Sequence, residues 1–149
     1  MIKKYAVILI VILFTSNCGF TPVYLNEGIK EISIEQIKLS GDRTLNNYLK
    51  SNLNKYRNKE STKKISLEVI SYYQKNILSK DSSGNTNKYE LVTEVIFTIN
   101  PYDQRLSFKQ NKIMENMANK SDERKFEIST KQTFANTIVN ELMDKLAKM

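Results

Sequence analysis

The chain has 149 residues, of which 40% are hydrophobic and 9% aromatic, which suits one compact domain. Its formal net charge is +7, and it contains a single cysteine and no histidine. Without histidine, a Ser-His-Asp triad, a Cys-His pair and a typical zinc site are excluded, and one cysteine excludes an internal disulfide. We therefore expect a protein that is not an enzyme and that needs no metal or cofactor.

Residues 1–17 have the organisation of an export signal. Lys3 and Lys4 precede the apolar run AVILIVILF, and the small and polar residues TSN follow it. The run is too short to cross a bilayer, which needs about 20 consecutive apolar residues. The alternatives are a buried N-terminal helix and a membrane anchor that is retained.

Cys18 comes directly after this segment. The segment resembles a bacterial lipoprotein signal, in which the cysteine receives a diacylglycerol and becomes the new N-terminus. Anchoring by several acyl chains is strong, because each buried CH2 contributes about 0.8 kcal/mol. In lipoproteins generally, Asp after the cysteine retains the protein at the inner membrane. Gly19 stands there instead, so the resemblance implies the outer membrane. The alternative for Cys18 is a buried or reactive free thiol.

Residues 18–30 are predicted to form an extended tether, because Pro22 disfavours helix for the residue before it. Residues 31–149 are predicted to form one domain. It opens with a strand over residues 31–39, in which the apolar alternation changes phase near Gln36 and indicates a bulge. A helix over residues 43–57 follows, with Asp42 as its N-cap. Its apolar face comprises Leu45, Tyr48, Leu49, Leu53 and Tyr56.

Two strands, residues 63–79 and 88–99, are predicted to form a hairpin around the turn cluster at residues 80–87. A fourth strand covers residues 105–117, after a tight turn at residues 100–104. Mostly apolar residues spaced by three and four predict a long amphipathic helix over residues 122–148. They are Phe126, Thr130, Phe134, Ile138, Leu142, Leu146 and Met149. The order β-α-β-β-β-α predicts an α+β, two-layer fold. Its four-stranded, mostly antiparallel sheet carries both helices on one face.

Charged residues on the predicted strands and loops allow two interpretations each. Glu68, Glu90 and Glu94 form a solvated or partner-facing row rather than a catalytic pair, because no pocket or metal motif accompanies them. A basic stripe could meet phosphates, and it comprises Lys55, Arg57, Lys59, Lys63 and Lys64. Lysine is abundant throughout the chain, and an exported protein rarely meets nucleic acid. The fitting anion is therefore a phosphorylated lipid.

The stretch CGFTPVY, residues 18–24, resembles the Cys-Gly-Phe-x-Pro-(Leu/Val)-Tyr opening of the lipopolysaccharide-assembly lipoproteins. These small outer-membrane lipoproteins partner the large barrel that translocates lipopolysaccharide. The element order and the ending KQTFANTIVNELMDKLAKM are also similar, although this chain has fewer alanines and arginines.

The resemblance implies a plug without catalytic activity, which sits in the barrel lumen, stabilises the barrel and helps to transfer lipopolysaccharide to the outer leaflet. Tyr72, Glu90, Glu94 and the turn at residues 80–87 are the residues expected to face the barrel. The alternatives are a generic envelope lipoprotein that acts as a binding or scaffold module, and an envelope enzyme such as a hydrolase.

Overall fold

The computed structural model describes residues 32–57, 61 and 63–149. The predicted signal at residues 1–17, the tether at residues 18–30, Cys18 and Lys59 lie outside the described residues. The elements, in chain order, are β1 (Ile32–Gly41), α2 (Arg43–Leu53), the short 3-10 helix η2 (Asn54–Tyr56), β2 (Lys63–Lys80), β3 (Thr86–Asn100), β4 (Gln104–Glu115) and α3 (Lys120–Leu146).

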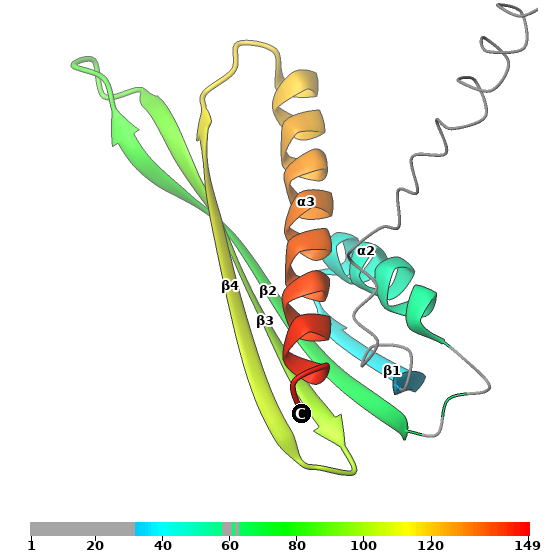
Figure 1. Ribbon diagram of the computed structural model, residues 1–149. Coiled ribbons are helices and arrows are strands. Elements are labelled where there is room, and N and C mark those ends of the chain that lie inside the picture. The colour runs from blue at the N-terminus through cyan, green and yellow to red at the C-terminus, as the bar shows by residue number, and fades with distance from the viewer. Residues whose placement is uncertain (1–31, 58–60, 62) are drawn as a thin grey trace, which may run out of the picture.

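The four strands form one sheet in the order β1-β2-β3-β4. β1 runs parallel to β2, because α2 carries the chain back between them, and the other two pairs are antiparallel. Both helices lie on the same face of this sheet (Figure 1). The predicted class is confirmed: an α+β, two-layer fold in the order β-α-β-β-β-α.

A bulge in β1 explains its change of phase. The register with β2 shifts between Ile34 and Gln36, as predicted. Ile34 lies opposite Ile65, and after the extra residue Ile37 lies opposite Leu67. Ile34 and Ile37 therefore both contact the core, although their spacing in the sequence is odd.

The junction between β1 and α2 needs a glycine. Gly41 has a φ of 101°, and a Cβ there would lie 1.9 Å from the carbonyl oxygen of Ser71. Asp42 then caps α2 as predicted, because its carboxylate accepts a hydrogen bond from the Leu45 amide at 2.8 Å. The predicted helix over residues 43–57 was too long. The chain tightens into η2 after Leu53, and the Arg57 amide donates to the Asn54 carbonyl at 3.3 Å.

The core lies between the sheet and the two helices. From α3 it contains Phe134, Ile138, Leu142 and Leu146, as the helical spacing predicted, and from α2 it contains Leu45, Leu49 and Leu53. Ala135, Val139 and Met143 are buried as well, because α3 packs against α2 in addition to the sheet. Helix α3 begins two residues earlier than predicted, since the Asn119 side chain accepts from the Ser121 amide at 2.9 Å and caps it.

Candidate interaction surface

Because both helices cover the same side of the sheet, every second strand residue points away from them. We call this second side the open face. It carries Glu68, Ile70, Tyr72 and Gln74 from β2, Glu90, Val92, Glu94 and Ile96 from β3, and Arg105, Ser107, Lys109 and Asn111 from β4. The alternation follows from strand geometry: Leu91, Val95 and Phe97, between these residues, are fully buried under the helices.

The centre of the open face is apolar and aromatic. Tyr72 is 52% exposed and Ile70 is 38% exposed. Ile96 lies opposite Ile70. Val92 is on the same face and lies opposite Gln74. A shallow hollow of about 390 Å³ is lined by Tyr72, Gln74, Val92, Glu94 and Lys109. Tyrosine is enriched at protein interfaces relative to the rest of the surface, so Tyr72 makes the open face a candidate interaction surface.

The carboxylates of the open face are held in cross-strand contacts. Glu94 accepts a hydrogen bond from the Ser107 hydroxyl at 2.8 Å, and its other oxygen lies 3.7 Å from the Lys109 ammonium. Glu90 accepts from the Asn111 amide at 3.1 Å. Glu68 pairs with Lys38 of β1 at 3.1 Å. Each carboxylate therefore has its own partner on a neighbouring strand, and the three do not meet as a catalytic pair.

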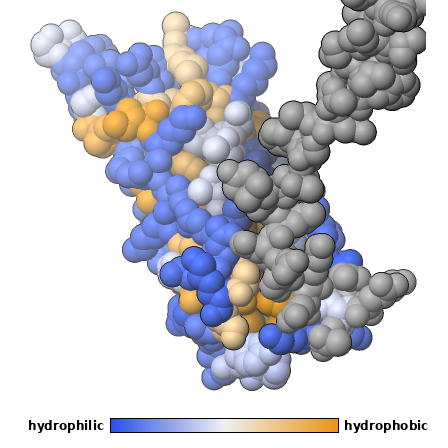
Figure 2. Space-filling model, viewed as in Figure 1, coloured by the Kyte–Doolittle hydropathy of each residue, from blue (hydrophilic) through white to orange (hydrophobic). Residues whose placement is uncertain are grey.

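The turn between β2 and β3 is built around Asp81. Its carboxylate accepts from the backbone amides of Ser83 and Asn85, both at 2.9 Å, and Gly84 takes a φ of 82° that suits glycine. The hairpin arms project away from the rest of the molecule on the side where α3 begins (Figure 1). Figure 2 shows hydrophobic surface on these arms amid hydrophilic surroundings. Ile77, Leu78 and Ile113 are exposed large hydrophobic residues in this part of the sheet.

The predicted basic stripe does not converge on one site. Arg57 donates to the Glu35 carbonyl at 3.1 Å, and Lys64 pairs with the Glu35 carboxylate at 2.9 Å, so these two meet at β1. Lys55 instead contacts Asn52 of α2 at 2.9 Å. The described members of the stripe are thus spread over two elements and engaged with groups of the chain itself.

A charged cluster between α3 and the sheet was not predicted from the sequence. The Lys75 ammonium of β2 contacts the carboxylates of both Glu123 and Glu127, and it lies 4.3 Å from the centre of the Tyr89 ring. The Glu123 side chain is only 8% exposed. Lys131 continues the cluster. We call Lys75, Glu123, Glu127 and Lys131 the α3 charge cluster.

Lys131 links the α3 charge cluster to α2. It pairs with Asp42, the N-cap of α2, at 2.8 Å and lies 3.7 Å from the centre of the Tyr73 ring. The Tyr73 hydroxyl lies 3.5 Å from Glu127, at the limit of a hydrogen bond. Burial, together with the negative charge of Glu127, raises the pKa of Tyr73 well above its usual range.

The α3 charge cluster also shifts the pKa values of its buried members. Hydrogen bonds from Lys120 and Lys75 hold the pKa of Glu123 below its ordinary value, against the opposing effect of burial. Burial by itself would lower the pKa of Lys75, but its hydrogen bonds to Glu123 and Glu127 outweigh burial and raise that pKa. Every charge in the cluster has an opposite partner, so the arrangement is structural in character.

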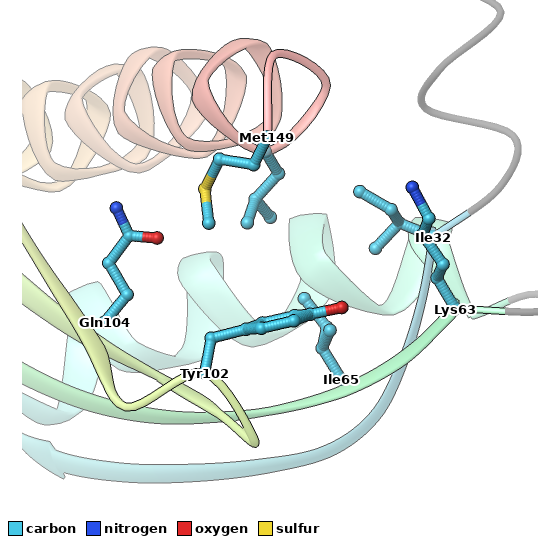
Figure 3. A pocket seen from close by; sticks show the side chains of 7 residues that line it. Ile32, Lys63, Ile65, Tyr102, Gln104 and Met149 are labelled. Carbon is cyan, nitrogen blue, oxygen red and sulfur yellow. The ribbon is translucent and has the colours of Figure 1, made fainter.

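A second hollow, of about 200 Å³, lies where β1 begins and α3 ends (Figure 3). These two segments are at the opposite end of the molecule from the β2–β3 turn (Figure 1). Its lining includes the buried side chains of Ile32, Ile65 and Leu146 and the exposed side chains of Tyr102 and Met149. Figure 3 shows Tyr102 on the sheet side of this hollow and Met149 on the helix side.

Within the described residues, no cluster of three or more acidic, cysteine or histidine side chains could hold a metal ion. No helix in the described part of the chain is long and apolar enough to cross a membrane. Neither observation concerns residues 1–31, where Cys18 lies.

Comparison with solved structures shows which proteins share this fold. The rare lipoprotein B of Shewanella oneidensis aligns with a TM-score of 0.54 and 15% identity, over 74% of this chain and 96% of its own. Lipoprotein B of Nitrosomonas europaea aligns with a TM-score of 0.54 and 16% identity, over 77% of this chain and 86% of its own. A minor lipoprotein of Acinetobacter baumannii aligns with a TM-score of 0.51 and 11% identity, over 74% of this chain and 93% of its own.

The other comparisons find no relative. No family model matches the chain, and no curated protein matches its sequence. At identities of 11–16%, the chain is similar to these lipoproteins in fold, and the similarity extends over most of their length.

Proposed function

We propose that this protein is a non-enzymatic outer-membrane lipoprotein that assembles with the lipopolysaccharide translocon barrel, occupies its lumen and aids lipopolysaccharide transport to the outer leaflet. One joint observation carries the proposal: a lipoprotein-like opening, CGFTPVY, precedes a domain with the fold of three solved bacterial lipoproteins. Cys18 is the lipidated residue, and its acyl chains anchor the protein in the membrane.

The open face is the surface that we assign to the barrel. The interior wall of a membrane barrel is polar, so a plug needs polar and aromatic groups rather than a continuous apolar patch. Tyr72 supplies exposed aromatic area. Glu90 and Glu94 supply polar groups, and Glu94 also has a cationic partner in Lys109. The turn at residues 80–87 extends this surface at the end of the hairpin.

Lipopolysaccharide is the second proposed partner. Removal of residues 1–17 takes away Lys3 and Lys4 and no acidic residue, so the mature chain keeps a formal net charge of +5. This charge favours the phosphate groups of lipopolysaccharide, and the contact is expected to be weak and sensitive to salt. No short motif identifies the basic residues that make it, and Arg57 and Lys64 are occupied by Glu35.

Absence of catalysis is part of the proposal. The chain has no histidine to act as a general base, and the carboxylates of the open face are each engaged by a neighbouring side chain. A role in binding and assembly needs only a stable surface, which the sheet provides. The main alternative is a generic envelope lipoprotein that serves as a binding or scaffold module.

Affinity isolation of the membrane-anchored protein in detergent tests the proposal. We expect an outer-membrane barrel in a one-to-one complex, and photocrosslinkers at several positions within residues 80–87 should yield a barrel-sized product. Depletion should lower the amount of mature barrel and weaken the outer-membrane barrier. If no barrel is captured and lipopolysaccharide export continues after depletion, the generic lipoprotein replaces this proposal.

Acylation is tested separately with a fatty-acid probe. The wild type should be labelled, and Cys18→Ser should not be. Equal labelling of both would exclude Cys18 as the lipidated residue while leaving the barrel experiment unaffected.

A further inference from the structure

The outer edge of β4 is a long, regular template for another strand. β4 pairs with β3 on one side, and among the described residues no element lies beyond it (Figure 1). Its register with β3 runs without interruption from Glu115 to Gln104. A strand at the edge of a sheet has unpaired backbone N–H and C=O groups along its outer side, and these can pair with an added strand.

The first strand of the sheet is less suited to such pairing. The bulge between Ile34 and Gln36 breaks the regular spacing of β1, and the Arg57 guanidinium already donates to the Glu35 carbonyl at 3.1 Å. Bulges and side-chain contacts of this kind are how proteins protect sheet edges. β4 has no register shift, so its length of 12 residues is available as one ladder.

The side chains of β4 indicate the chemistry of the added strand. Arg105 and Lys109 lie on the open face, and Lys112 lies on the helix side. Glu115, at the end of β4, is the only acidic residue of the strand. Lys109 is still 71% exposed despite its contact with Glu94. A strand added here would therefore place its side chains next to a basic row, and acidic residues would complement it.

Helix-side residues of β4 add a requirement for apolar groups. Leu106 is half-buried at the edge of the core, and Phe108 beside it is 9% exposed. The complementary segment therefore alternates, with acidic side chains toward Arg105 and Lys109 and apolar side chains toward Leu106.

We propose that the outer edge of β4 binds an extended acidic segment of a partner protein, which adds a fifth strand to the sheet. This inference rests on the sheet and its charges and does not depend on the proposed barrel. A second copy of this chain is the wrong partner. Antiparallel pairing of two β4 edges would bring three basic residues of each copy, Arg105, Lys109 and Lys112, into one interface against one acidic residue, Glu115. This excess of like charge disfavours pairing between two copies.

The probe is a fluorescent ten-residue peptide of alternating glutamate and valine, added to the full chain in detergent. We expect saturable binding, together with slower hydrogen exchange of the amides of residues 104–115. The control peptide has the same sequence with every second backbone nitrogen methylated, which removes the hydrogen bonds of a strand and keeps the charges. Its affinity should be at least tenfold lower. Equal affinity of the two peptides, or unchanged exchange in β4, would overturn the proposal.

Two double variants test whether the peptide binds at β4 or is held by general electrostatic attraction. Arg105→Glu with Lys109→Glu should weaken the glutamate–valine peptide at least tenfold and should favour a lysine–valine peptide instead. Lys50→Glu with Lys145→Glu makes the same change in net charge elsewhere, on α2 and α3, and should have little effect on either peptide. Equal losses in both variants would contradict the assignment. Sedimentation gives a second test. If the unmodified chain is a dimer and the β4 variant is a monomer, the proposal is wrong, because a second copy of the chain then occupies the β4 edge.

Discussion

The two halves of α3 attach to the same sheet by different chemistry. From Phe134 to Leu146 the buried side of the helix is entirely apolar. From Lys120 to Lys131 it contains the nearly buried Glu123, the half-buried Glu127 and the buried Thr130, and the α3 charge cluster joins it to β2 and α2. One continuous helix therefore combines a hydrophobic interface with a charged one.

The position of α2 explains this difference. α2 covers the second half of α3, where Asn52 bonds Asn136 at 2.6 Å, and the first turns of α3 extend past it (Figure 1). A helix between a sheet and another helix is enclosed on two sides and needs apolar residues there. A helix with only the sheet beneath it keeps water at its flanks, so paired charges cost less to place in the interface.

The two halves of α3 should therefore contribute differently to the stability of the fold and to its dependence on pH. Apolar burial contributes most of the free energy of unfolding and depends little on pH. The α3 charge cluster contributes less but depends on protonation, because its groups have shifted pKa values.

The largest effect is expected in the apolar half. Leu142→Ala should lower the free energy of unfolding by about 2–5 kcal/mol, because the side chain is fully buried and its removal leaves a cavity. Urea denaturation of the full chain in detergent measures the change. Ile128→Ala, on the same helix but 40% exposed, is the matched control and should cost much less. Similar costs for both would show that the apolar half does not dominate.

A smaller effect is expected from the α3 charge cluster. Glu123→Gln keeps the shape of the side chain but removes its charge, and should cost about 1–3 kcal/mol because charge-assisted hydrogen bonds are lost. Lys120→Gln is the control, since this partner of Glu123 is largely exposed, and its loss should cost about 0–1 kcal/mol. A cost of Lys120→Gln equal to that of Glu123→Gln would place the main interaction at the surface rather than at Lys75.

The pH dependence of stability should come from the charged half. The pKa of Glu123 is lowered in the folded chain from an ordinary value of 4.5, so the unfolded chain binds this proton more readily. The stability that Glu123 contributes is complete above pH 4.5 and is lost as the pH falls through the folded value. The difference in unfolding free energy between wild type and Glu123→Gln should therefore be smaller at about pH 3 than at about pH 7.

At high pH, the stability of the charged half depends on Lys75. Its pKa is raised above 10.5 in the folded chain, so its contribution is complete below pH 10.5 and is lost as the pH rises through the folded value. Leu142→Ala should show no such window, because it removes no titratable group. A constant difference between wild type and Glu123→Gln at all pH values would contradict the role of the charged half.

The apolar half was predictable from the sequence, and the charged half was not. Spacings of three and four residues identified Phe134, Ile138 and Leu142, since helical periodicity depends only on neighbouring sequence. Lys75 and Glu123 are 48 residues apart, and nothing local connects them. Glu123 also stands in the charged run SDERK, which is typical of an exposed helix start. Its burial depends on the length of β2, whose arm reaches beneath the first turns of α3.

The open face was only partly predictable from the sequence. Glu90 and Glu94 alternate with Leu91 and Val95, so period-two spacing was sufficient to place them on the side away from the helices. Their partners, Asn111 and Lys109, come from the register of β4, which the sequence pattern left undetermined. A register shifted by one residue would have placed different side chains beside them.

The smallest effect on stability is expected on the open face, where neither kind of α3 contact is involved. Tyr72→Ala should change the free energy of unfolding by about 0.5 kcal/mol or less, because the residue is about half exposed and lies outside the core between the sheet and the helices. Under the proposed function it should nevertheless reduce capture of the barrel in detergent. Tyr102→Ala is the matched control, since this tyrosine has similar exposure, 58%, but lies at the turn between β3 and β4. If both variants retain the barrel equally, Tyr72 does not belong to the interface. If Tyr72→Ala alone unfolds the domain, the ring is part of the fold, and the division between a stabilising helix side and a binding open face is wrong.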